Sequence, residues 1–207
     1  MSQKDIKLVI FDIGRVILDF DHMITCRKLA QYSKKDEKYI YDYIFKPEVL
    51  NEYEKGKISS LKMFGTISDK LGLDIPFEKF KEIWGDIFSL KEGAVELIRR
   101  VKKAARIAVL SNTDEMHFDF IMDRVEIMKD FDWLFLSHKI GFRKPDKEIF
   151  EYITKITGFA PNEIVFIDDI EEFVVAARKY GIKGILFKDI NTLEKDLEAM
   201  VLSRYNH

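Results

Sequence analysis

Cysteine, excess charge and long hydrophobic runs are all scarce in this 207-residue chain. The single cysteine, Cys26, excludes an intramolecular disulfide, and we expect it to be buried as a small hydrophobe. The formal net charge of −2 comes without the asymmetry of sign that indicates nucleic-acid binding. No apolar run approaches the roughly 20 residues of a membrane span, and residues 1–5 show no signal-peptide pattern. We therefore expect a cytoplasmic globular protein with neither nucleic-acid nor membrane partners, of unknown oligomeric state.

Short runs rich in Ile, Val, Leu and Phe alternate with helical patterns over much of the chain. All-apolar runs of this length are typical of strands buried on both faces of a parallel sheet. We predict a doubly wound, Rossmann-like α/β core. The predicted strands are residues 6–12, 105–111, 132–137, 164–168 and 183–187. The predicted helices are residues 93–103, 114–128, 146–157, 171–180 and 191–204.

Several predicted helices carry boundary signals. Asp146 is expected to cap the helix 146–157, and Asn191 and Thr192 are alternative caps for the last helix. Gly158 and Gly181 follow helical patterns, at the position where a left-handed residue ends a helix.

Residues 18–92 break this alternation and have the pattern of successive amphipathic helices. Ser59 is a plausible cap for one of them, because a 3.6-residue apolar stripe follows it. We predict that 18–92 form an all-helical cap domain, inserted into a core domain of residues 1–17 and 93–207. The predicted cap helices are residues 23–31, 35–45, 47–55, 59–71 and 76–89.

Acidic side chains end two of the predicted strands. Asp12 follows the first apolar run and enters a glycine turn, and Asp168 and Asp169 follow the run that begins at Ile164. The carboxyl ends of parallel strands gather at one edge of the sheet, where open α/β folds bind ligands. Adjacent carboxylates repel each other unless a cation joins them, and Mg²⁺ prefers carboxylate and phosphate oxygens. Taken singly, Asp12 is better explained as a turn former or cap, whereas the acid pair is explained equally well as surface acids in a turn.

Uncharged polar groups and a cation occupy two further segments. Ser111 and Asn112 follow a predicted strand, where a hydroxyl, backbone N–H groups and a helix N-terminus can hold an oxyanion. Lys144 precedes Pro145, which favours an extended backbone and suits a cation that reaches into a site. The alternatives are a helix cap at 111–112 and an exposed loop lysine. Only the order of all four segments makes a chance gathering improbable.

Four motifs resemble those of the haloacid dehalogenase-like superfamily, namely FDIG at 11–14, LSNT at 110–113, RKPD at 143–146 and FIDD at 166–169. The resemblance covers the whole chain, because that superfamily carries an optional helical cap between its first and second motifs. The chain looks similar to the branch of bacterial sugar-phosphate phosphatases that includes alpha-D-glucose-1-phosphate phosphatase. The resemblance implies a magnesium-dependent phosphatase of small phosphorylated metabolites, with sugar phosphates as expected substrates.

The resemblance also implies roles for individual residues. Asp12 would attack phosphorus and form an aspartyl-phosphate that water hydrolyses. Mg²⁺ would be held by the side chains of Asp12 and Asp169 and the carbonyl of Gly14, with Asp168 beside it. Lys144 would also keep Asp12 ionised. The oxygens of the transferring phosphoryl group would be stabilised by Ser111, Asn112 and Lys144.

Two residues depart from the family pattern. Gly14 stands where most phosphatases of the superfamily have a second Asp, and loss of positioned acid–base catalysis costs about 10²–10⁴-fold. We therefore expect a preference for anomeric, acyl or aryl phosphates, unless a cap residue replaces the acid. The nearest titratable candidates to replace the acid missing at Gly14 are Asp19, Asp21 and His22.

Phe173 stands where related sequences often carry an Asn that orients a metal ligand.

Other features leave alternatives open. A hydrolytic dehalogenase of the same fold attacks carbon and needs no acid at Gly14, but it has no use for an acid pair. A non-catalytic binding protein would tolerate Gly14 and Phe173, but would not need the nucleophile, the lysine and the acids. Arg15 can meet the substrate phosphate or face solvent, and His117 and His138 are expected to be structural or exposed rather than catalytic.

Substrate choice in the superfamily depends mainly on the cap, because the core handles only the phosphoryl group. We expect residues 16–20 and 89–93 to act as hinges of a cap that closes over the core. Helical spacing favours interior packing for most of the aromatic and charged cap residues, which include Tyr41, Tyr43, Phe45, Tyr53, Lys57 and Trp84.

Overall fold

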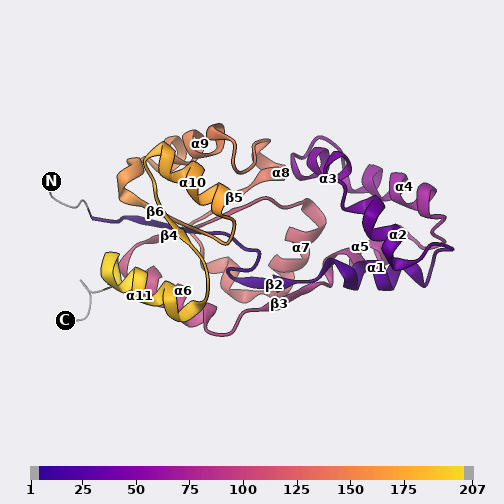
Figure 1. The fold of residues 1–207 in the computed structure, drawn as a ribbon, viewed down its shortest axis with the longest axis horizontal. Helices are drawn as coiled ribbons and strands as arrows, with labels where there is room; N and C mark the ends of the chain where they lie inside the picture. The colour runs from indigo at the N-terminus through magenta and orange to yellow at the C-terminus, as the bar shows by residue number, and fades with distance from the viewer. Residues whose placement is uncertain (1–4, 203–207) are drawn as a thin grey trace.

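The computed structural model describes residues 5–202, which form two parts along one long axis (Figure 1). A sheet with flanking helices makes up one part, and helices α1–α5 make up the other. Residues 1–4 and 203–207 of the predicted core domain, with the predicted helix end at Arg204, lie outside the described residues.

The main sheet has five parallel strands in the order β5-β4-β1-β6-β7. All five predicted strands are present, and each ends within two residues of its predicted ends. The chain adds β4 and β5 on one side of β1 and later adds β6 and β7 on the other. This reversal puts a ligand-binding crevice at the carboxyl end of β1. The strands are β1 (Leu8–Phe11), β4 (Arg106–Ser111), β5 (Trp133–Leu136), β6 (Ile164–Asp168) and β7 (Lys183–Leu186).

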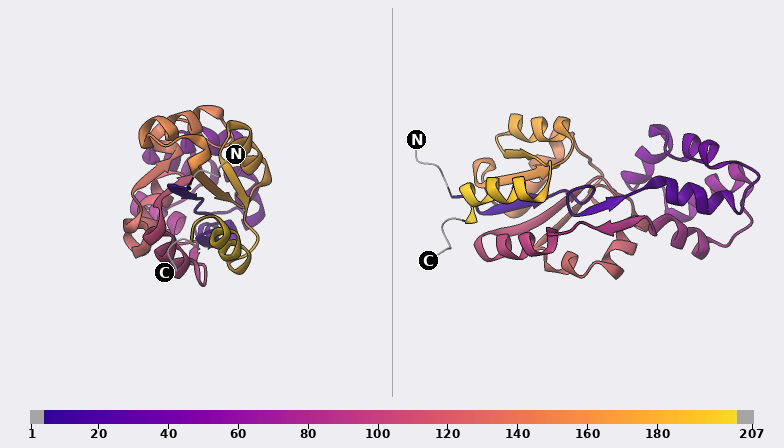
Figure 2. Two further views of the ribbon diagram at one scale, coloured as in Figure 1. Left: turned by 90° about the vertical axis from the view of Figure 1, so that its left-hand side faces the viewer. Right: turned by 60° about the horizontal axis from the view of Figure 1, so that its bottom comes forward.

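Two helical layers bury the two faces of this sheet (Figure 2). On β1, Val9 and Phe11 pack into one apolar cluster, and Leu8 and Ile10 pack into the cluster on the opposite face. Successive strand residues point to opposite faces, so burial on both faces explains the continuous apolar run. One layer consists of α6 (Ala94–Ala104), α7 (Glu115–Arg124) and α11 (Ile190–Met200), and the other of α9 (Lys147–Thr157) and α10 (Glu171–Tyr180).

The helices predicted between residues 18 and 92 are all present. They enclose a separate apolar cluster, in which Cys26 is fully buried, as predicted. Ser59 caps α4 as predicted, and its Oγ accepts the N–H of Lys62 at 3.3 Å. The helices are α1 (His22–Ala30), α2 (Glu37–Ile44), α3 (Pro47–Glu54), α4 (Ser60–Leu71) and α5 (Phe77–Gly85).

Both ends of this segment are extended, so the prediction that all of 18–92 is helical is wrong there. Two short strands, β2 (Leu18–Phe20) and β3 (Phe88–Leu90), pair antiparallel and connect the two parts. The predicted helix 76–89 therefore ends at Gly85. A strand of three residues is too short to show an alternating pattern, and a helical pattern beside it dominates the sequence signal.

The predicted helix boundaries are partly correct. Gly158 and Gly181 adopt left-handed conformations after their helices, with φ of 73° and 99°, as predicted. Asp146 precedes α9 but makes no capping hydrogen bond, and its carboxylate instead accepts the N–H of Arg143 at 3.4 Å. The predicted cap at Asp146 is therefore wrong in its hydrogen bonding.

The last and the longest predicted helices also differ from the structure. Asp189 caps α11 by accepting the N–H of Thr192 at 2.8 Å, so both predicted caps, Asn191 and Thr192, are wrong. The predicted helix 114–128 ends at Arg124 and continues as a 3₁₀ helix, Glu126–Asp130. A short helix, α8 (Ser137–Ile140), follows β5 where the sequence gives no helical period.

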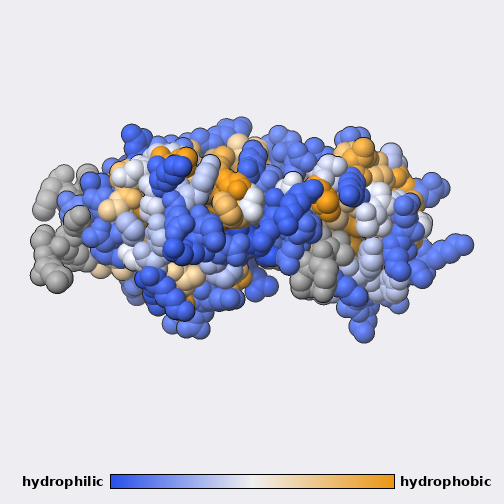
Figure 3. All heavy atoms as spheres, turned by 90° about the horizontal axis from the view of Figure 1, so that it is seen from above, coloured by the Kyte–Doolittle hydropathy of each residue, from blue (hydrophilic) through white to orange (hydrophobic). Residues whose placement is uncertain are grey.

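Hydrophilic residues dominate the face seen from above, with small, separate hydrophobic areas (Figure 3). Within residues 5–202, none of the helices combines the length and the apolar character that crossing a membrane requires.

Close contacts join the cap helices to the core. Gly85 of α5 packs against α7, and a Cβ at this position would lie 2.6 Å from ring and Cβ atoms of Phe120. Gly56, after α3, has φ of 68°, and a Cβ there would lie 2.0 Å from the carbonyl oxygen of His138. A Cβ would force a shift at both positions, of the Phe120 side chain in one case and of the His138 backbone in the other.

We expect Gly85→Ala to lower the free energy of unfolding by about 1–3 kcal/mol, the usual cost of overpacking a buried contact. Gly65→Ala is the matched control, because Gly65 lies inside α4 and a Cβ there meets nothing within 4 Å. This control is expected to raise the free energy by about 0.5–1 kcal/mol, the usual gain from glycine to alanine in a helix. Urea denaturation of both variants tests the contact, and equal effects would contradict it.

Candidate active site

The carboxyl edge of the sheet brings together Asp12, Ser111 and Asp168. β1 lies between β4 and β6, and the register pairs Phe11 with both Val109 and Ile167. Asp12 and Asp168 are therefore at the same level, and Ser111 is one residue further along. The three residues are buried, with exposed fractions of 7%, 4% and 0% in that order. The predicted gathering of strand ends is confirmed.

Lys144 joins the two buried carboxylates. Its Nζ lies 2.7 Å from Oδ1 of Asp12 and 2.6 Å from Oδ2 of Asp168, and the residue is only 2% exposed. The alternative of an exposed loop lysine is therefore wrong. Burial alone would lower the pKa of Lys144, but the charges of Asp12 and Asp168 hold this pKa above its ordinary value. Burial, with the charge of Asp168, raises the pKa of Asp12 to about 6 against the opposing effect of Lys144.

Asn112 fixes the backbone of Lys144. Its Oδ1 accepts the N–H of Lys144 at 2.8 Å, and its Nδ2 donates to the carbonyl oxygen of the same residue at 2.9 Å. Both ends of the amide side chain are thus bonded to the loop that carries the lysine. The ring of Phe173 lies 5.2 Å from the lysine Nζ, at the position where related sequences often have Asn.

Asp12, Asp168 and Asp169 form a cluster whose nearest carboxylate oxygens lie within 4.8 Å of one another. Burial and the charge of Asp168 raise the pKa of Asp169, which shows that the cluster disfavours a further negative charge. Two of the three carboxylates contact the ammonium group of Lys144, and Arg15 acts on Asp169, so a bound cation would stabilise the remaining negative charge. Hard oxygen ligands of this kind suit Mg²⁺, and the residues present therefore fit that ion.

A pocket of about 430 Å³ opens above this cluster. Gly14, Ser111, Asn112 and Lys144 line it together with Asp12 and Asp169 on the core side. Arg15 also lines the pocket although its side chain is exposed. The rest of the lining is mostly apolar and aromatic, and includes Phe20, His22, Phe45, Leu50, Phe88 and Ile121.

The structure sorts the residues that the sequence singled out around this pocket. His22 lines it, whereas Asp19 pairs with Lys91 at 2.7 Å and Asp21 caps α1. Asp19 and Asp21 are therefore not placed to replace an acid at position 14. Of the six aromatic and charged cap residues singled out, Phe45 faces the pocket, while Tyr53 and Trp84 are buried in the cap and Tyr41 is exposed.

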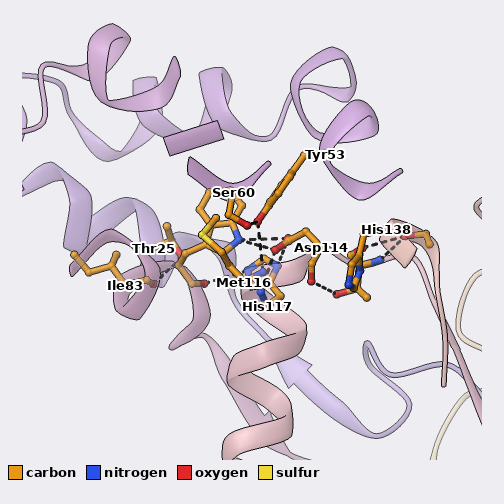
Figure 4. A network of polar contacts seen from close by, with 11 residues as sticks. Thr25, Tyr53, Ser60, Ile83, Asp114, Met116, His117 and His138 are labelled. Atoms are coloured by element: carbon orange, nitrogen blue, oxygen red, sulfur yellow. Dashed lines mark hydrogen bonds and ion pairs between the residues drawn. The ribbon is translucent and has the colours of Figure 1, made fainter. Parts of the chain in front are cut away.

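The first turn of α7 holds cap and core together (Figure 4). Asp114 caps this helix, and its Oδ2 lies 2.6 Å from Nδ1 of His117. The indole N–H of Trp84, on α5, donates to Asp114 at 3.3 Å, and Nε2 of His117 lies 3.0 Å from the carbonyl oxygen of Trp84. Burial would raise the pKa of Asp114, but His117 holds it below its ordinary value. His138 bonds to the carbonyl oxygen of Thr113 at 3.0 Å, so the structural role predicted for both histidines agrees with these contacts.

A second set of contacts ties α3 and α4 to the same turn. The hydroxyl of Tyr53 lies 2.8 Å from Oγ of Ser60, and it accepts the N–H of Met116 at 3.4 Å. Ser60 in turn donates to Glu115. Glu54, next to Tyr53, lines the pocket and pairs with Arg143. Glu54 is not among the residues predicted from the sequence, because no local pattern distinguishes it from the other acids of the cap.

The sequence model of the haloacid dehalogenase-like hydrolase family matches residues 6–181, which is most of the chain. The chain belongs to the haloacid dehalogenase-like hydrolase family. The family, the hydrolase class and the parallel-sheet fold predicted from the sequence are thus confirmed.

Similar proteins in this hydrolase family include named phosphatases. D-ribitol-5-phosphate phosphatase of Bacteroides thetaiotaomicron is 25% identical over 183 residues, covering 85% of this chain and 89% of that protein. Sesquiterpene phosphatase astK of Aspergillus oryzae is 26% identical over 209 residues, covering 94% and 96%. A crystal structure of the Bacteroides thetaiotaomicron enzyme bt-2542, in complex with magnesium and inorganic phosphate, matches with a TM-score of 0.80 and 23% identity, covering 89% and 95%.

The pocket histidine makes stability depend on pH. The ring of His22 lies between those of Phe20 and Phe45, at centroid distances of 4.9 and 4.1 Å, and its buried Nδ1 has no hydrogen-bond partner among the described residues. Burial, followed by the charge of His117, lowers the pKa of His22 to about 4. The unfolded chain therefore protonates His22 at a higher pH than the folded chain does, near the ordinary pKa of 6.5 instead of about 4.

We expect this hydrolase to lose about 2–3 kcal/mol of stability through His22 as the pH falls from 6.5 to 4, since each unit of pKa difference is worth about 1.4 kcal/mol. His22→Phe should remove that part of the pH dependence. Urea denaturation with EDTA at pH 7, 6, 5 and 4.5 compares the two slopes. Parallel slopes for the variant and the unsubstituted protein would contradict the assignment.

Proposed function

We propose that this hydrolase is a magnesium-dependent phosphatase of small phosphorylated metabolites, sugar phosphates among them, that acts through an aspartyl-phosphate on Asp12. The observation that carries the proposal is the buried Lys144 between Asp12 and Asp168, beside a third carboxylate and at the base of a pocket. The phosphatase names of the relatives agree with it.

In the proposed reaction, the carboxylate of Asp12 attacks phosphorus and the alcohol oxygen of the substrate departs. Lys144 holds this carboxylate ionised and oriented through their contact at 2.7 Å. The Ser111 hydroxyl donates to an oxygen of the phosphoryl group at the end of β4. Water then cleaves the aspartyl-phosphate and restores Asp12.

Magnesium would be held by Asp12, Asp169 and the carbonyl oxygen of Gly14, with Asp168 beside it. The ion would supply positive charge that allows an anionic phosphate to approach a carboxylate. Asp168 is fully buried, and it also accepts the N–H of Ile170 at 2.9 Å, so its orientation is fixed from two sides.

Asn112 has a different role in this proposal than the sequence indicated. Its amide is bonded to the backbone of Lys144 at both ends, so we assign it to positioning the lysine. Residues 18–92 would form the cap that selects the leaving group, with the apolar side of the pocket against that group. Residues 16–20 and 89–93, around the β2–β3 pair, would bend when the cap moves.

Asp12→Asn is expected to lower kcat for p-nitrophenyl phosphate about 10³-fold or more, the scale of losing a nucleophile. Excess EDTA should abolish turnover by the unsubstituted protein, and added Mg²⁺ should restore it. Asp69→Asn is the matched control, because Asp69 is an exposed acid on α4 outside the pocket and the hinges. Steady-state release of nitrophenolate is the measurement.

Three results would contradict the proposal. Full activity of Asp12→Asn would exclude the nucleophile. Metal-independent release of halide from a 2-haloacid, without phosphatase activity, would indicate a dehalogenase. Tight binding of phosphorylated metabolites without turnover of any of them would indicate a binding protein.

A further inference from the structure

The turn after Asp12 is tight at Gly14. A Cβ there would lie 3.0 Å from Cε1 of Phe20, so a larger side chain would require the ring from β2 to shift by a few tenths of an ångström. Hydrolysis of an ordinary alkyl phosphate still needs a proton for the departing oxygen. That proton must come from another side of the pocket.

Most titratable groups that line the pocket are committed to other contacts. Lys144 bonds to two carboxylates. Asp114 pairs with Nδ1 of His117, and Nε2 of that histidine faces the carbonyl oxygen of Trp84. Asp12 and Asp169 belong to the acid cluster of the core. His22 is neutral at pH 7, with a pKa of about 4, and has no proton to give as an imidazolium.

Glu54 is the carboxylic acid that the cap contributes to the pocket lining. It is the last residue of α3, and its side chain is 19% exposed. Oε2 lies 3.1 Å from Nη2 of Arg143 but takes part in no hydrogen bond of regular geometry within the described residues. Burial raises the pKa of Glu54 against the charge of Arg143.

We propose that Glu54 is the general acid and base of this enzyme, delivered by the cap in place of a residue at position 14. The inference rests on the proposed phosphatase function. It would place the proton donor on a cap residue that lines the same pocket as Asp12.

The proposed steps balance without a further reactant. Asp12 forms a bond to phosphorus while the phosphorus–oxygen bond of the ester breaks, and the departing oxygen takes the proton of Glu54. Water next attacks the phosphorus of the aspartyl-phosphate and gives a proton to the Glu54 carboxylate. Asp12, protonated Glu54 and inorganic phosphate remain, together with the free alcohol.

The Glu54–Arg143 pair also has a purely structural explanation, in which it fastens the cap to the loop that carries Lys144. Arg143 also donates to Asn51 on α3. A fastening role would affect every substrate alike, whereas a proton donor matters most for leaving groups that depart poorly as anions. The dependence on the leaving group therefore separates the two.

The test measures kcat/KM, in the presence of Mg²⁺, for a series of phosphate monoesters from p-nitrophenyl phosphate to simple alkyl phosphates. Circular dichroism checks that each variant is folded. Glu54→Gln should lower kcat/KM about 10²–10⁴-fold for alkyl phosphates, the usual value of a positioned acid, and by a much smaller factor for p-nitrophenyl phosphate. The variant should also show a burst of nitrophenolate, because the aspartyl-phosphate would accumulate without its base.

Two controls accompany this variant. Glu52→Gln removes an exposed carboxylate from the same helix, paired with Lys57, and should leave the whole series unchanged. Asn51→Ala loosens Arg143 and keeps Glu54, so any loss should be the same factor for every ester.

An equal loss for all esters in Glu54→Gln would overturn the proposal in favour of fastening. A steep dependence on the leaving group in the unsubstituted enzyme, unaltered in Glu54→Gln, would overturn it in favour of a site without an acid. Failure of the unsubstituted protein to hydrolyse p-nitrophenyl phosphate with Mg²⁺ is a separate result, and would contradict the phosphatase function itself.

Discussion

The ammonium group of Lys144, enclosed between Asp12 and Asp168, is the interaction on which the site depends. Removing one member of such a buried pair typically costs about 3–5 kcal/mol, because the remaining charge is left without compensation. The three residues come from β1, β6 and the loop before α9, so their contact requires the strand register and the amide bonds from Asn112. The three charges therefore come together only when the sheet is folded in this register.

The core of this arrangement is readable from the sequence, because its signals are local. The β1 run is apolar at every position, and two-sided burial explains that; Asp12 and Asp168 follow such runs directly. The short strands β2 and β3 lack a period, and the contact of Phe20 with Gly14 depends on the pairing of segments about 70 residues apart in the chain. Such long-range packing leaves no mark in the sequence around either residue.

Long-range contacts also decide the roles of Glu54, which no sequence pattern marks, and of Asn112, whose role differs from the one predicted. Glu54 is one acid among many on amphipathic cap helices, and only its position in the pocket separates it from an exposed neighbour such as Glu52. Asn112 follows a strand next to Ser111, which favours a substrate contact, but its amide is bonded to the backbone of Lys144. Residue type and spacing identify the polar edge, while hydrogen bonding decides which members face a ligand.

A proton donor on the cap needs a cap that returns to the same place in every cycle, and the first turn of α7 provides this reference. α7 begins soon after Ser111 and Asn112, so its first turn is fixed by β4. Tyr53 contacts that turn through Met116 and Ser60, and Glu54 is the next residue along α3. A short chain of contacts thus relates Glu54 to the carboxyl end of the sheet. Opening of the cap would break these bonds and withdraw the acid, so proton transfer would be confined to the closed arrangement.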